Sequence, residues 1–144
     1  MDISELVTQD NAEKGVWFRY VVGGKKYPFS ICILGADSDK VLLYNKKKEK
    51  EAQKELGLMF RNVDESEQEI ETANDIRERK LSDALVRIVG LRSEDKEPLT
   101  MQGVELKSDE NSYRLICTKI PDIVDFVISK SNSRLNFLEN RKKY

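Results

Sequence analysis

The sequence contains no histidine and only two cysteines, Cys32 and Cys117, among its 144 residues. Histidine is the side chain that most often serves as a general base near neutral pH and as a metal ligand, so the commonest forms of both sites are excluded. The cysteines have neither the spacing of a zinc site nor the density of a secreted disulfide scaffold, and we expect both to be small buried apolar side chains. The sequence has no glycine-rich phosphate loop and no serine or cysteine nucleophile with an identifiable base. We therefore expect no metal site, no cofactor and no enzymatic activity.

The chain also lacks a long apolar run and an excess of charge of either sign. No stretch approaches the roughly 18 apolar residues of a membrane-spanning helix, and residues 1–5 lack the basic and apolar regions of a signal peptide. The formal net charge is −1, unlike the basic footprint of a nucleic-acid-binding protein. We expect a cytoplasmic protein that forms one domain over residues 1–144 and binds neither membranes nor nucleic acid.

An alternating pattern of side chains predicts a β-hairpin over about residues 16–35. The pattern is interrupted by Gly23-Gly24, which suits a tight two-residue turn between the strands. It ends at Gly35-Ala36-Asp37-Ser38, where the period changes from that of a strand to that of a helix. A turn at the two glycines would set the following residues opposite one another: Val22 and Lys25, Tyr20 and Tyr27, Phe18 and Phe29, Val16 and Ile31.

Apolar residues at helical spacing predict about four helices after the hairpin. Asp37 or Ser38 suits the N-cap of the first helix, where Val41, Leu42 and Leu43 would begin its buried end. The fold class is therefore α+β, with an N-terminal antiparallel β-hairpin or small sheet packed on a bundle of about four α-helices. The helices are expected over about residues 38–60, 65–89, 108–120 and 121–140.

Three further residues suit the ends of the later helices. Gly90 suits the C-cap of the second helix, and Ser108 suits the N-cap of the third. Pro121 suits the first turn of the fourth helix, because the N–H that proline lacks has no intrahelical partner there.

Lysines recur at every fourth position of the first predicted helix. Lys46, Lys50 and Lys54 would therefore lie in one basic stripe on the helix surface. The stripe is either a docking face for a partner or an ordinary solvated surface.

The last predicted helix carries two aromatic residues away from its apolar face. Val124 and Val127 mark the apolar face, and Phe126 and Phe137 would project from the other side of a continuous helix. Exposed aromatic side chains would indicate a partner surface. The polar triplet Ser131-Asn132-Ser133 also suits a helix break and a fresh N-cap, and a break there would remove the basis for this surface.

Several short motifs follow one another along nearly the whole chain. They are, in order, Gly15-Val16-Trp17, Leu34-Gly35-Ala36-Asp37-Ser38 with the charged helix after it, Leu81-Ser82-Asp83-Ala84-Leu85-Val86 leading to Gly90, then Gly103, Asn111 and Asn136-Phe137-Leu138. In their order and spacing the chain resembles the siphophage tail assembly chaperones. One departure is Leu91, which stands where many of those proteins have tryptophan and keeps the position apolar.

The resemblance implies a non-catalytic protein of the host cell cytoplasm, absent from the mature virion. Such a protein binds the tape measure protein and keeps it soluble while tail tube protein subunits polymerise around it. Its physical task is to cover a long apolar helix reversibly, through an exposed apolar patch with a charged rim. In this chain we expect the patch at Phe126, Phe137 and Leu138, and the rim at Lys46, Lys50 and Lys54.

One alternative belongs to another class of protein. A permanent virion component, such as a head–tail connector or a tail-terminator subunit, would use the same hairpin and helices to form a ring. Whether the chain forms a homo-oligomer is left open by the sequence.

Overall fold

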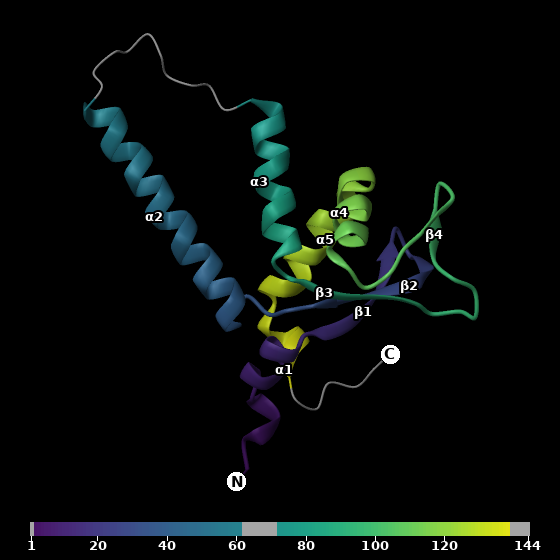
Figure 1. The fold of residues 1–144 in the computed structure, drawn as a ribbon. Helices are drawn as coiled ribbons and strands as arrows, with labels where there is room; N and C mark the ends of the chain where they lie inside the picture. Colours follow the sequence, from purple (N-terminus) through teal and green to yellow (C-terminus); the bar gives the residue numbers. More distant parts are fainter. Residues whose placement is uncertain (1, 62–71, 139–144) are drawn as a thin grey trace.

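The protein has an α+β fold, as expected from the sequence, with a three-stranded antiparallel sheet in the order β1-β2-β3 (Figure 1). The computed structural model describes residues 2–61 and 72–138. The strands are β1 (Val16–Val22), β2 (Lys25–Ile33), β3 (Ile88–Ser93) and a separate short pair, β4 (Thr100–Met101) and β5 (Val104–Glu105). The α-helices are α1 (Gln9–Lys14), α2 (Asp39–Arg61), α3 (Ala73–Leu85), α4 (Glu110–Lys119) and α5 (Pro121–Asn132), and the 3-10 helices are η1 (Ser4–Leu6) and η3 (Arg134–Phe137).

The hairpin turns at Gly23-Gly24 as expected, but its register changes farther from the turn. Both glycines have positive φ angles, 58° and 80°, which suit a turn that bulkier residues rarely adopt. A bulge then shifts the pairing along the rest of the two strands. The observed pairs there are Phe18 with Ile31 and Val16 with Ile33, so the expected pairs of Phe18 with Phe29 and Val16 with Ile31 are wrong.

The bulge places Tyr27, Pro28 and Phe29 opposite the single residue Tyr20. Phe29 stacks on Tyr20 with 5.2 Å between the ring centroids, and the Tyr27 ring lies 5.6 Å from that of Tyr20. Pro28 has no N–H to offer a strand ladder, so it is tolerated in such an irregularity. The aromatic rings therefore gather around Tyr20 instead of forming two separate cross-strand pairs.

The second predicted helix ends earlier than expected. α3 stops at Leu85 and residues 88–93 form β3, so the expectation of a helix up to residue 89 is wrong; its expected part over residues 65–71 lies outside the described residues. Gly90 is an inner residue of β3 and not a C-cap. The ring of Trp17 lies so close that a Cβ atom at Gly90 would be 2.6 Å from Trp17 Cη2. Close approach of this ring therefore requires glycine in the strand.

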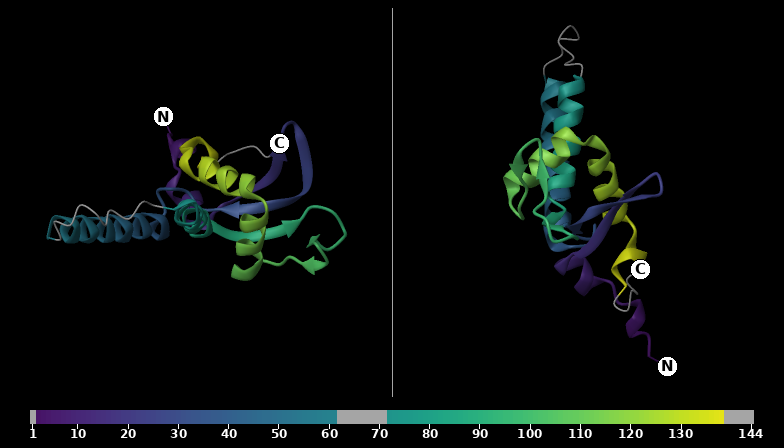
Figure 2. Two further views of the ribbon diagram at one scale, coloured as in Figure 1. Left: turned by 90° about the horizontal axis from the view of Figure 1, so that it is seen from above. Right: turned by 90° about the vertical axis from the view of Figure 1, so that its right-hand side faces the viewer.

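Helices α3, α4 and α5 pack against one another, and α5 also lies against β2 (Figures 1 and 2). Leu91 of β3 is buried, in keeping with the apolar character expected at this position. The fully buried residues that form the centre of this core come from both layers: Ile31 and Ile33 from β2, Ile88 from β3, Ala84 from α3, Ile116 from α4, Ile123 and Val127 from α5, and Phe137 from η3.

The N-cap of α4 differs from the expected one. Asp109 caps the helix by accepting a hydrogen bond from the Ser112 N–H at 2.8 Å. The Ser108 hydroxyl instead bonds the backbone of Leu91 in β3. Ser108 therefore ties the start of α4 to the sheet, while the adjacent carboxylate satisfies the helix terminus.

The last predicted helix breaks at the polar triplet. α5 ends at Asn132, and Ser133 has an extended backbone with φ −94° and ψ 107° before η3 begins. The expectation that this helix continues to residue 140 is therefore wrong for residues 133–138. Residues 139–140 lie outside the described part. The break lets the chain fold back so that the Phe137 ring reaches Phe18, with 6.1 Å between ring centroids.

We expect Gly90→Ala to lower the free energy of unfolding by about 1–3 kcal/mol, because the new methyl group overlaps the Trp17 ring. Gly57→Ala is the matched control, since no heavy atom lies within 4 Å of a Cβ added at this helical position. That substitution should stabilise the protein by about 0.5–1 kcal/mol. Urea unfolding followed by circular dichroism measures both changes, and a neutral Gly90→Ala would contradict the packing described.

Candidate functional site

Helix α2 leaves the rest of the protein and presents nearly all of its surface over residues 39–57 to solvent (Figures 1 and 2). Over residues 39–57, Val41 is the one buried residue. Leu42 and Leu43 are 51% and 67% exposed, so the expectation that they begin a buried helix end together with Val41 is wrong. Over these residues the helix therefore lacks the buried apolar face that normally stabilises a surface helix.

Helix α3 is exposed at its beginning and buried at its end. Residues 73–80 are exposed, whereas Leu81, Ala84 and Leu85 lie in the core. Near the buried end, Lys48 Nζ of α2 lies 2.5 Å from Asp83 Oδ1 of α3. From this ion pair the two helices diverge (Figure 1). We refer to α2 together with residues 73–80 of α3 as the arm.

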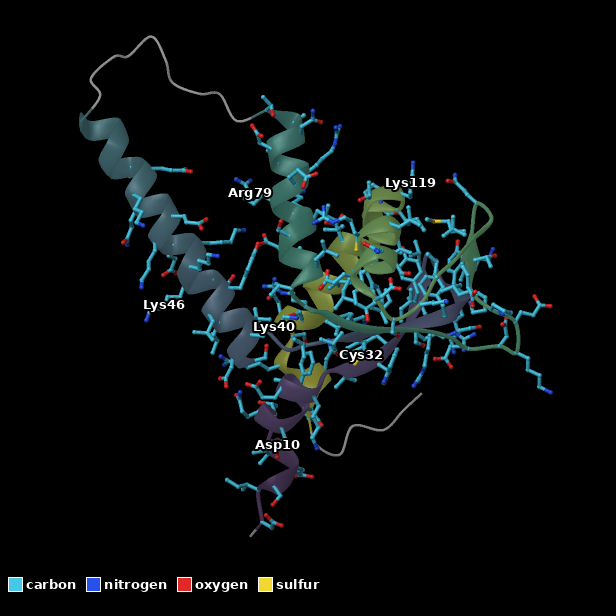
Figure 3. The ribbon with its side chains drawn as sticks, in the orientation of Figure 1. Asp10, Cys32, Lys40, Lys46, Arg79 and Lys119 are labelled. Carbon is cyan, nitrogen blue, oxygen red and sulfur yellow. The ribbon has the colours of Figure 1, made fainter. Side chains whose placement is uncertain are left out.

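The ion pair shows which sides of the two helices face each other. Helical periodicity places Leu56, eight residues beyond Lys48, about 80° round α2 from it, at the flank of the side that faces α3. It places Ile76, two turns before Asp83, on the same side of α3, and Figure 3 shows Arg79 extending from α3 toward α2. Leu56 is 53% exposed and Ile76 is 37% exposed. The inner sides of the arm therefore carry exposed apolar side chains next to charged ones, which suits an amphipathic helix.

The predicted lysine rim forms a row on the arm. Lys46, Lys50 and Lys54 are all exposed, and Figure 3 shows Lys46 on the side of α2 that faces away from α3. Lys48, which belongs to a neighbouring stripe, is the lysine that reaches α3. The lysine row therefore lies on the outer side of α2, away from α3. It does not surround the aromatic residues of α5.

The predicted apolar patch is not exposed as expected. Phe137 is 1% exposed in the core, so the expectation that it projects from a wet helix face is wrong. Phe126 is half-buried, with its ring edge-on to Tyr20 at 5.0 Å between centroids, and Leu138 is half-buried as well. The helix break is the physical reason, because it turns Phe137 inward. The polar triplet Ser131-Asn132-Ser133 was the sequence signal for this outcome.

A buried hydrogen-bond network joins the base of the arm to the sheet. The Arg87 side chain follows α3, is 6% exposed, and donates from Nε to Ser131 Oγ at 3.1 Å. The Ser131 hydroxyl donates to the Leu34 carbonyl oxygen at 2.7 Å, and the Leu34 N–H donates to the Arg87 carbonyl oxygen at 2.7 Å. Burial lowers the pKa of Arg87, and the nearby Asp83 carboxylate opposes that shift. The sequence shows no pattern that would have identified this network.

The two thiols are poorly placed for chemistry. Burial raises the pKa of Cys32 to about 11 and that of Cys117 to about 12. Both thiols therefore stay protonated at neutral pH, and a protonated thiol is a weak nucleophile.

The described residues offer neither a metal site nor a helix that could span a membrane. Over residues 2–61 and 72–138, no group of three or more Cys, Asp and Glu side chains is placed to hold a metal ion. Within the same ranges, no helix has the length and apolar character that crossing a bilayer requires.

Comparison with known proteins adds no relative. No protein-family model, curated protein sequence or solved structure matches the chain.

We expect Ser131→Ala to lower the free energy of unfolding by about 1–3 kcal/mol, since it leaves the Leu34 carbonyl and the Arg87 Nε–H buried without this partner. Ser129→Ala on the exposed side of the same helix is the control and should change stability by about 0.5 kcal/mol or less. Thermal and urea unfolding of both variants would measure the difference. Equal effects would show that the network contributes little.

Proposed function

We propose that the chain is a non-catalytic tail assembly chaperone of a siphophage. In this role it binds the tape measure protein in the host cell cytoplasm while tail tube subunits assemble around that protein. The proposal rests on the ordered motifs from Gly15 to Leu138 for its biological context. The observation that carries it physically is the arm, whose long helix α2 leaves the body of the protein with Leu42, Leu43 and Leu56 exposed.

The arm suits the binding of a helical partner. Ile76 is an exposed apolar residue on the side of α3 that faces α2, and Leu56 is one at the flank of the facing side of α2. An amphipathic helix lying between α2 and α3 would bury both residues and leave its own polar side in solvent. Because the ion pair between Lys48 and Asp83 is partly exposed, it contributes at most about 1 kcal/mol and would allow the helices to adjust to a partner.

The charges of α2 favour reversible binding. Lys46, Lys50 and Lys54 lie on the outer side of α2 and keep that side solvated when the inner side is covered. They also offer a basic surface to acidic side chains of the tape measure protein or of tail tube subunits. Interactions of exposed charges weaken as salt increases, so such contacts are easily released.

Leu56→Glu should weaken binding of the tape measure protein, because it places a charge in the apolar contact between α2 and the bound helix. Leu43→Glu is the matched control: the same substitution at a similarly exposed residue of α2, but on its outer side. We expect wild type and Leu43→Glu to keep co-expressed tape measure protein soluble, and Leu56→Glu to lose at least about half of that yield. Both variants should unfold like the wild type, because the replaced leucines are exposed. Equal yields from the two variants would exclude the inner side of the arm as the binding site.

A chaperone and a permanent virion component differ in where the chain is found after assembly. We expect the chain to be recovered with the tape measure protein from lysates of phage-producing cells and to be missing from purified virions. Quantitative mass spectrometry of both fractions measures this. Recovery from virions at a fixed copy number would favour the connector or tail-terminator alternative and overturn the proposal.

A further inference from the structure

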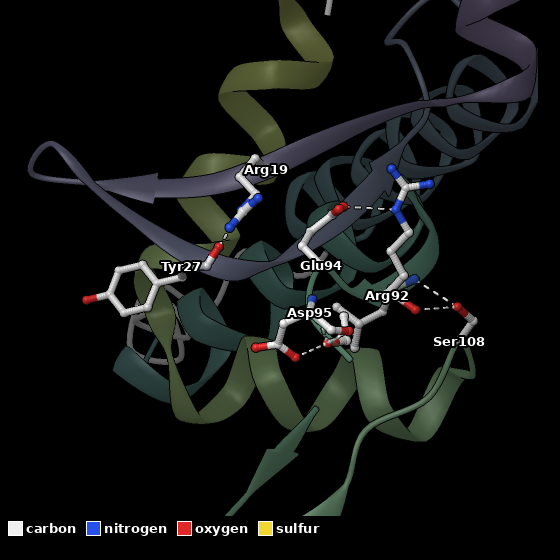
Figure 4. Close-up of polar contacts among 8 residues, drawn as sticks. Arg19, Tyr27, Arg92, Glu94, Asp95 and Ser108 are labelled. Atoms are coloured by element: carbon white, nitrogen blue, oxygen red, sulfur yellow. Dashed lines mark hydrogen bonds and ion pairs between the residues drawn. The ribbon is translucent and has the colours of Figure 1, made fainter. Parts of the chain in front are cut away.

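The two edges of the sheet differ in how they are satisfied. At the β3 edge, the Ser108 hydroxyl accepts a hydrogen bond from the Leu91 N–H at 2.9 Å and donates one to the Leu91 carbonyl oxygen at 2.7 Å (Figure 4). At the β1 edge, no backbone hydrogen bond from another described segment reaches Trp17, Arg19 or Val21. The edge of β1 is therefore open within the described part of the chain, and an open edge is a template for another strand.

The register identifies the backbone groups that the open edge presents. Leu91 pairs with Ile31 but turns its N–H and C=O outward to Ser108. Since these groups alternate along antiparallel strands, Ile31 turns toward its partner on β1, Phe18, and Phe18 turns toward β2. The neighbours Trp17 and Arg19, and Val21 beyond them, then point their N–H and C=O groups away from the sheet. These residues provide a ladder of the kind that a bound extended peptide uses.

A groove runs along this edge. It is a cavity of about 600 Å³ lined on one side by Trp17 and Arg19 of β1 with Arg92 of β3, and on the other by Lys130 and Leu138. We call it the β1 groove. The Arg92 guanidinium lies 4.2 Å from the centroid of the Trp17 ring, so a cation–π contact holds it at the wall of the groove. The groove thus combines apolar side chains such as Trp17 and Leu138 with a row of outward backbone groups, within reach of one extended chain.

The charge of the β1 groove is mostly positive. Figure 4 shows Arg19 and Arg92 on either side of Glu94. Glu94 Oε1 lies 2.9 Å from Arg92 Nε, and its pKa is lowered by hydrogen bonds to Ser30 and Arg92 and by the charge of Arg19. One carboxylate therefore faces several cations. The charged residues that line the groove are Arg19, Lys26, Arg92, Lys130 and Glu94.

We propose that the β1 groove binds an extended acidic segment of another protein, which joins the sheet as a strand beside β1. Acidic side chains of that segment would lie on the face of Arg19 and Arg92, and the alternate apolar side chains on the face of Leu138. This interaction goes beyond the chaperone function, because no residue of the arm lines the groove.

The positive charge of the β1 groove disfavours two other occupants. A second copy pairing through its own β1 would bring another Arg19 and Lys26 to a groove that is already basic. Residues 139–144 of this chain are also unfavourable, since Arg141, Lys142 and Lys143 outnumber Glu139. An acidic partner is the occupant that complements the groove.

The lone tryptophan allows a direct test, because Trp17 is the chain's only tryptophan and lines the groove. The probe is a short peptide in which glutamate and valine alternate, and the control peptide has lysine in place of glutamate. We expect the acidic peptide to shift Trp17 emission saturably, with binding that weakens as salt is raised, and the lysine peptide to bind at least about tenfold more weakly. Equal binding of the two peptides, or no binding of the acidic one, would overturn the proposal.

Two kinds of variant distinguish the contribution of the β1 backbone to peptide binding from that of the charged side chains in the groove. Val21→Pro removes an outward N–H from the edge without a donor being lost from the β1–β2 ladder, and should weaken peptide binding about tenfold. The double variant Arg19→Glu, Lys26→Glu should weaken it at least as much and keeps the backbone intact if Val21→Pro fails to fold. The double variant Lys46→Glu, Lys50→Glu on the arm is the matched charge reversal and should bind like the wild type. Binding unaffected by the double variant would overturn the proposal.

Sedimentation velocity addresses a second copy as the occupant. We expect the chain not to associate through β1 at concentrations where the peptide binds. A dimer that Val21→Pro abolishes, together with no peptide binding, would assign the edge to a second copy and overturn the proposal. Val21→Pro does not alter the arm, so this outcome leaves the chaperone proposal to its own tests.

Discussion

The hydrogen bonds among Arg87, Ser131 and Leu34 hold the elements of this protein in their places. Arg87 follows α3, Ser131 lies in α5, and Leu34 follows β2, so three elements far apart in sequence meet at one buried point. A buried guanidinium is costly without partners, and here the Ser131 hydroxyl supplies one while also satisfying a backbone carbonyl. The direction in which α3 leaves the body, and hence the base of the arm, depends on this point.

The structure keeps its stability and its candidate binding surfaces in different regions. The sheet and α3, α4 and α5 enclose the apolar core, whereas residues 39–57 of α2 contribute little beyond Val41 to the buried interior. The arm and the β1 groove therefore lie outside the core, where substitutions change binding more readily than folding. They also differ in kind, since the arm offers helix surfaces and the groove offers a strand edge.

Much of the fold could be predicted from local patterns. The alternating hairpin, its glycine turn, the long charged helix and the proline at the start of α5 are each encoded within a few neighbouring residues. The failures came where distant contacts outweigh local preference. β3 continues an amphipathic pattern that suits a helix, yet it joins the sheet because Gly90 accommodates Trp17 and Leu91 fills the core. The bulge opposite Tyr20 likewise depends on ring packing across strands.

The candidate site shows the same division. The lysine row on α2 follows from helical spacing alone, because residues four apart share a side whatever lies around them. The sequence by itself thus determined the fold class, the turn and which residues share a helix face. Tertiary structure alone decided which faces are covered: Phe137 became core, Leu42 and Leu43 stayed in solvent, and the β1 edge stayed open among the described residues. Periodicity sets neighbours within an element, but burial is set by which elements meet, and those contacts join residues that are far apart in the chain.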